Sequence, residues 1–166
     1  SETDRLAELN KHRPPEGYTM FIVSVICAWS PDYTMNLLAQ GADPLLTDIY
    51  GNNALHVAAK ENRPLWIPML IDNGVIPLDT LSTPGQTALW YAGERGFLCI
   101  VVLLVEAGAD TEKTGAGILT PLGIAQVNRH TAVANYILYE SPKVRNQAWR
   151  RRRPFAIVLS SIKNVE

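Results

Sequence analysis

The sequence predicts an all-α protein, a solenoid of stacked helix-turn-helix pairs joined by short hairpin loops. Three observations support this. A Gly-x-x-Ala-Leu pattern recurs after 34 residues, and each copy precedes an apolar run that ends in glycine. The chain has 166 residues, 47% hydrophobic and 19% charged, which is typical of one folded domain. Because one helix pair alone leaves an apolar face in water, such repeats become stable by stacking.

The repeat pattern sets the order of the elements. Gly51 and Gly85 begin the two clearest copies, a third begins near Leu119, and a weaker copy begins at Gly17. We expect four repeats at about residues 17–48, 49–82, 83–115 and 116–140. Thr87 and Thr120 precede first helices, where a side-chain oxygen satisfies free backbone N–H groups.

Glycines and prolines mark where the second helices end or fail. Gly41, Gly74 and Gly108 follow leucine-rich runs, at positions where a left-handed residue ends a helix. Pro64 and Pro68 lie in the second-helix region of the 49–82 repeat, and an interior proline costs about 3 kcal/mol. We therefore expect that helix to be short or to begin late.

Segments outside the repeats close the two ends. Residues 1–13 favour a short helix against the first repeat. In residues 141–166, Phe155, Val158, Leu159 and Ile162 follow a helical spacing, which predicts basic C-terminal capping helices. Residues 1–140 carry 8 basic and 15 acidic side chains, whereas residues 141–166 carry 7 basic and 1 acidic. The formal net charge of −1 thus combines an acidic array with a basic end.

The pattern resembles the ankyrin repeat, whose signature is T-P-L-H-x-A followed by an L-L-x-x-G-A-D-type ending. Gly41-Ala42-Asp43 and Gly108-Ala109-Asp110 reproduce that ending, and the resemblance covers residues 17–140. It implies a single ankyrin-repeat domain that binds another protein through a concave face of hairpin tips and inner-helix positions. It also implies that His56 forms hydrogen bonds between neighbouring repeats.

Carried onto this sequence, the partner-binding positions are Ile49, Tyr50, Asn52, Lys60, Glu61, Thr83, Gln86, Glu94, Arg95, Leu119 and Asn128. Tyr50 is the best single anchor, because tyrosine offers a large contact area with few rotatable bonds. The alternative, that Tyr50 packs along its own hairpin, remains open. Trp66 is expected in the interior, and Trp90 between hairpin and helix.

Nothing in the sequence favours catalysis, a cofactor or a metal. No histidine has a nucleophile or carboxylate at motif spacing. The glycines of Gly115-Ala116-Gly117 fit the approach to a hairpin loop and do not match a phosphate-binding motif. We expect no enzymatic activity. Cys27 and Cys99 lie two repeat periods apart, beyond the reach of a disulfide, which favours a cytoplasmic or nuclear protein. The longest charge-free stretch, Tyr18 to Pro31, has 14 residues and predicts a buried core helix.

The run Arg150, Arg151, Arg152 and Arg153 leaves several alternatives. On a helix these side chains fan out by about 100° per residue, so they cannot all face one partner. They could pair with the acidic array as part of a cap, form a nuclear-import signal, or contact nucleic acid or an anionic membrane. The chain also lacks an initiator methionine. It could therefore be the docking domain of a larger enzyme or effector.

Overall fold

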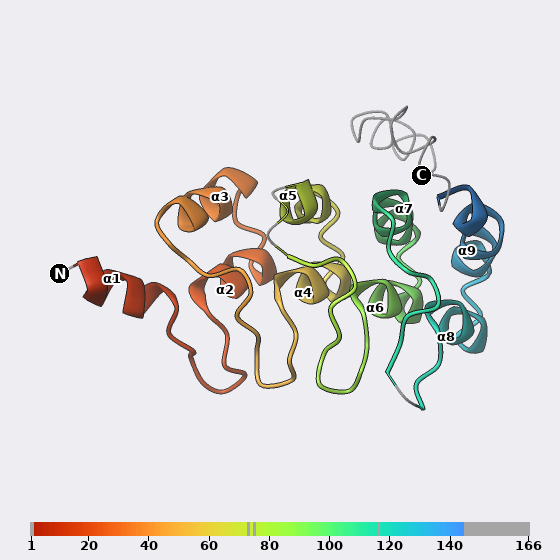
Figure 1. The fold of residues 1–166 in the computed structure, drawn as a ribbon, viewed down its shortest axis with the longest axis horizontal. Helices are drawn as coiled ribbons and strands as arrows, with labels where there is room; N and C mark the ends of the chain where they lie inside the picture. Colours follow the sequence, from red (N-terminus) through yellow and green to blue (C-terminus); the bar gives the residue numbers. More distant parts are fainter. Residues whose placement is uncertain (1, 73, 75, 116, 145–166) are drawn as a thin grey trace.

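The computed structural model describes residues 2–72, 74, 76–115 and 117–144, and these residues form nine helices. After α1 (Glu2–Leu9), the helices alternate between two rows (Figure 1). The inner row is α2 (Met20–Ile26), α4 (Ala54–Lys60), α6 (Ala88–Arg95) and α8 (Pro121–Val127). The outer row is α3 (Pro31–Ala39), α5 (Trp66–Asp72), α7 (Leu98–Ala107) and α9 (Thr131–Val144). The predicted all-α solenoid is confirmed.

Each inner helix begins at a side chain that caps its first turn. Thr87 and Thr120 accept the backbone N–H groups of the residues three positions on, at 3.1 Å each. Asn53 does the same for α4, where its Oδ1 accepts from two N–H groups. These caps satisfy donors that an isolated helix end leaves to water. They fix where each loop ends and each inner helix begins.

The turns between inner and outer helices share one backbone feature. Each contains a residue in the left-handed region: Ala28 (φ 52°), Asn62 (φ 53°), Gly96 (φ 74°) and Arg129 (φ 61°). These four positions are 34, 34 and 33 residues apart. The chain therefore reverses in the same way in every repeat, although only Gly96 and Asn62 are of residue types that favour this conformation.

The core lies between the two rows and between successive pairs. α4 packs against α2 and α6, α6 against α8, and α7 against both α5 and α9. Leu55 and Leu89, the leucines of the repeated motif, are buried. The charge-free stretch supplies α2, whose Phe21 and Ile22 are also buried, as predicted.

The prolines act on α5 as predicted. This helix begins at Trp66, two residues later than α7 does in the same repeat frame, and it has 7 residues against 10 in α7. Trp66 is buried, and its Nε1 donates to Thr34 Oγ1 at 3.4 Å. Cys27 and Cys99 form no disulfide. Within the described residues, no helix combines the length and the apolar character needed to cross a membrane.

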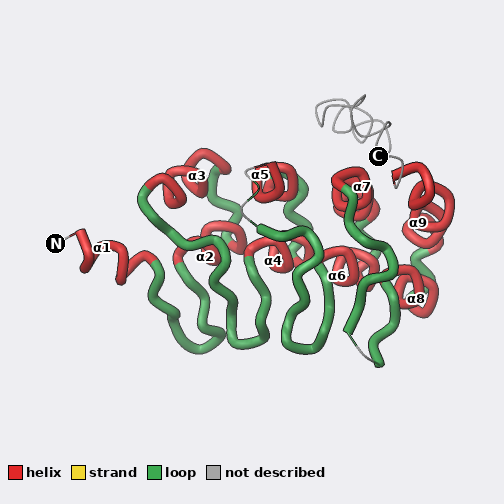
Figure 2. Tube along the Cα trace, in the orientation of Figure 1, coloured by secondary structure: helices red, strands yellow, loops and turns green. Residues whose placement is uncertain are grey.

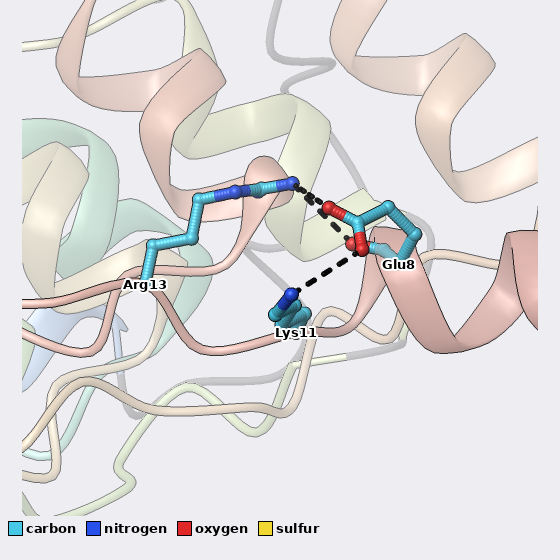
Figure 3. Close-up of polar contacts among 3 residues, drawn as sticks. All are labelled: Glu8, Lys11 and Arg13. Atoms are coloured by element: carbon cyan, nitrogen blue, oxygen red, sulfur yellow. Dashed lines mark hydrogen bonds and ion pairs between the residues drawn. The ribbon is translucent and has the colours of Figure 1, made fainter.

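The predicted N-terminal helix is α1, and it packs on the first repeat. Arg5 Nη2 donates to Gln40 Oε1 at 2.6 Å, and Asn10 Oδ1 accepts the Asp43 N–H at 2.7 Å. The carboxylate of Glu8, within α1, contacts Lys11 at 3.7 Å and Arg13 at 3.0 Å, both of which follow the helix (Figure 3). The N-terminal end of the array is thereby covered.

At the other end, α9 runs to Val144, past the expected repeat boundary at residue 140. The predicted capping helices of residues 145–166, with Arg150 to Arg153, lie outside the described residues.

Candidate functional site

The loops that join successive repeats project from one side of the inner row (Figure 2). In the second loop, buried Asp48 forms the turn, because its Oδ1 accepts the N–H groups of Tyr50 at 2.9 Å and Asn52 at 2.8 Å. Gly51 completes the turn with a φ of 73°. Ile49 and Tyr50 therefore lie at the tip, with 61% and 50% of their surfaces exposed.

Neighbouring loops are joined through their backbones. The Ile49 N–H donates to Glu16 O at 3.0 Å, the Thr83 N–H to Tyr50 O at 2.9 Å, and the Gly115 N–H to Gly85 O at 2.7 Å. Gly85 and Gly115 approach so closely that a Cβ on Gly115 would lie 2.7 Å from Gly85 Cα. The four loops thus form one continuous edge of the molecule.

Two buried side chains connect the inner helices to the following loop. His56 Nε2 lies 2.9 Å from Thr80 O and 3.2 Å from Gln86 O, so the ring donates from this nitrogen to the next loop. Trp90 holds the same repeat position, and its Nε1 donates to Leu119 O at 2.8 Å. Burial lowers the pKa of His56. The expected places of His56 and Trp90 are confirmed.

The structure places most of the predicted site residues at the surface. The exposed ones are Ile49, Tyr50, Glu61, Thr83, Arg95, Leu119 and Asn128, and the half-buried ones are Lys60, Gln86 and Glu94. Asn128 also donates from Nδ2 to Glu94 O at 2.8 Å, and Lys60 Nζ lies 5.9 Å from the centre of the Tyr91 ring.

Asn52 corrects the sequence-based expectation of an exposed tip residue. Only 1% of its surface is exposed, because its backbone N–H and Nδ2 both donate to the buried Asp48 carboxylate. Its Oδ1 is buried and has no hydrogen-bond partner within the described residues. Asn52 therefore belongs to the turn itself.

Sequence reasoning missed an acidic and aromatic region beside the first two loops. Tyr18 is half-buried, and burial raises its pKa, as do the charges of Glu16, Asp48 and Glu61. Tyr18 occupies the repeat position of Asn52, a signal hidden by the weak match of the first repeat. Within the described residues, Glu16 and Glu61 form no ion pair.

The pKa of Tyr91 in the middle of the inner row is also raised, chiefly by burial. A hydrogen bond with Ser82 opposes this rise, and the charges of Asp48 and Glu94 add to it. In the described part of the chain, no three His, Cys, Asp or Glu side chains come together as a metal site would require.

Comparison with known proteins shows where this architecture recurs. A family profile described as ankyrin repeats (3 copies) matches residues 24–115. The chain is 34% identical over 85 residues to a B-cell lymphoma 3 protein homolog from Mus musculus, covering 49% of this chain and 19% of that protein. It is 35% identical over 85 residues to NF-kappa-B inhibitor alpha from Homo sapiens, covering 48% of this chain and 27% of that protein.

A third relative is palmitoyltransferase AKR1 from Mortierella alpina, which is 37% identical over 67 residues, 40% of this chain and 12% of that protein. The chain therefore spans less than a third of the length of each of these relatives. The similarity lies in the repeats that the proteins share.

Proposed function

Since the chain belongs to the ankyrin-repeat family, whose repeats are generally protein-binding modules, we propose that it binds another protein through its hairpin–inner-helix face. This face consists of the exposed side chains at the loop tips and at the ends of the inner helices: Ile49, Tyr50, Glu61, Thr83, Arg95 and Leu119. Lys60, Gln86, Glu94 and Asn128 border it.

The observation that carries this proposal is the presentation of Ile49 and Tyr50. Each of these two side chains has at least half of its surface exposed. The buried Asp48 carboxylate fixes the turn that carries them. A surface already ordered before binding loses little conformational entropy when a partner arrives. Exposed tyrosine is also enriched among residues that dominate interface energies.

The experiment is a pull-down from the source cell with the double variant Tyr50→Ala and Arg95→Ala. Leu138→Ala is the control, because Leu138 is similarly exposed but lies on the outer helix α9. The double variant should lose the partner recovered by wild type, while the control should keep it. Equal recovery by all three proteins, with unchanged helical circular dichroism, would refute the proposed face.

We also propose that the chain has no catalytic role of its own and acts in the cytoplasm, with the nucleus as the alternative. His56 supports the first part, because its Nε2 is engaged by backbone carbonyl groups in the interior. The two cysteines, which form no disulfide, support the second.

A further inference from the structure

The first two loops and the end of α4 form a surface whose chemistry is more specific than that of the whole face. The acidic tyrosine surface consists of Glu16, Tyr18, Ile49, Tyr50 and Glu61. The backbone bond between Ile49 N and Glu16 O at 3.0 Å brings the first two loops together. Helix α2, which follows Tyr18, packs against α4, and Glu61 is the C-cap residue of α4. The Glu61 charge also helps to raise the pKa of Tyr18. Two aromatic rings and two carboxylates therefore share one surface.

The carboxylates on this surface have no cation within the described residues. Glu61 is exposed, Glu16 is half-buried, and neither forms an ion pair there. The nearest basic side chain along the chain, Lys60, is directed over the ring of Tyr91 instead. The surface thus offers acceptors and aromatic faces but few donors.

The complementary ligand group is a guanidinium. Its planar N–H fork matches carboxylates, and its flat face stacks on tyrosine, whereas an ammonium group acts as a hydrated point charge. Residues 1–140, with 15 acidic against 8 basic side chains, complement the charge of such a ligand locally, within a chain whose formal net charge is −1.

We propose that the acidic tyrosine surface binds an extended, arginine-bearing segment of the partner protein. The inference rests on the proposed function and adds the partner's chemistry to it. An extended segment fits because the contacts are distributed along adjacent loops and the end of α4. Its arginines would lie against Tyr18 and Tyr50 and pair with Glu16 and Glu61.

The test uses the full chain and a fluorescent dodecapeptide of alternating arginine and glycine, with alternating lysine and glycine as the comparison peptide. Binding is measured by fluorescence anisotropy at low and high salt. We expect the arginine peptide to bind more tightly, and the double variant Glu16→Gln and Glu61→Gln to weaken it about three- to tenfold at low salt. Tyr50→Ala should weaken it about fivefold.

The matched control is Glu2→Gln with Glu112→Gln, which removes the same charge from exposed positions elsewhere. This control should change the Kd less than about twofold. Equal weakening by both double variants, or no binding at low salt, would overturn the proposal. So would a severalfold gain in affinity when Arg150 to Arg153 are changed to glutamine, because the chain's own tail would then be the occupant.

These outcomes separate the inference from the proposed function. If the peptide fails to bind while Tyr50→Ala with Arg95→Ala still loses the cellular partner, only the arginine assignment is wrong. If partner recovery is unaffected by that double variant, the proposed face itself is wrong. Circular dichroism and thermal unfolding of each variant show whether the fold is intact.

Discussion

Replacing Gly96 by alanine probes the turn that links α6 to α7. Gly96 has a φ of 74°, and a left-handed alanine costs about 1–2 kcal/mol. Alanine also lowers the conformational entropy of the unfolded chain, which offsets about 0.4–1 kcal/mol of this cost. In addition, the new Cβ would lie 2.5 Å from His130 Nδ1 and 2.8 Å from two carbons of the same ring. The His130 ring would have to move.

That movement breaks a defined contact, since His130 Nε2 hydrogen-bonds Glu94 O at 3.0 Å. A lost hydrogen bond costs about 0.5–1.5 kcal/mol, so we expect Gly96→Ala to lower the free energy of unfolding by about 1.5–2.5 kcal/mol. Gly117→Ala is the matched control, because Gly117 has a φ of 76° and open space around its missing Cβ. It should cost about 1 kcal/mol.

The assay is urea unfolding followed by circular dichroism at 25 °C, with the slope checked for a change in two-state behaviour. Introducing Gly96→Ala into a His130→Ala background should reduce its cost to that of the control. If Gly96→Ala and Gly117→Ala lower the free energy of unfolding equally in the wild-type background, the His130 ring moves aside without an energetic penalty. The close contact would then carry no energy.

Two further predictions concern the side chains that connect inner helices to the following loop. Because burial lowers the pKa of His56, the unfolded chain gains its proton first as the pH falls below about 6.5. The free energy of unfolding should therefore fall from there toward the folded-state pKa. Urea titrations at several pH values should show that the free energy of unfolding falls less with decreasing pH in His56→Gln than in the exposed control His12→Gln. An equal dependence on pH in the two variants would contradict this prediction. Trp90→Phe removes the donor to Leu119 O and should cost about 1–2 kcal/mol. Trp66→Phe should lower the stability less than Trp90→Phe does, because the hydrogen bond that it removes is 3.4 Å long. A larger drop in the urea midpoint for Trp66→Phe than for Trp90→Phe would contradict this reasoning.

The repeat spacing predicted the helix pairs because hydrophobic burial imposes it on every copy. Leu55 and Leu89 are buried where the motif places them, and Pro64 and Pro68 delay α5 as expected. The left-handed turns escaped prediction, because Ala28 and Arg129 are not residues that signal this conformation and Asn62 does so less strongly than glycine. Stacking of the helices, a tertiary effect, holds these residues there.

The candidate site was predictable where exposure follows from the repeat position alone, as at Tyr50 and Arg95. The expected exposure of Asn52 was wrong, because its backbone N–H and Nδ2 donate to the buried Asp48 carboxylate. Tyr18 and Glu16 were missed because their surface arises only when the first two loops pair through Glu16 O. Such pairing has no signature in either loop taken alone.

The backbone bonds between loops also change how these exposed tips exchange with solvent. Loops on a protein surface usually release their amide hydrogens quickly. Here the amides of Ile49, Thr83 and Gly115 are each held by a neighbouring loop. Deuterium would enter them only when two repeats separate, so three surface amides act as reporters of the coupling between repeats.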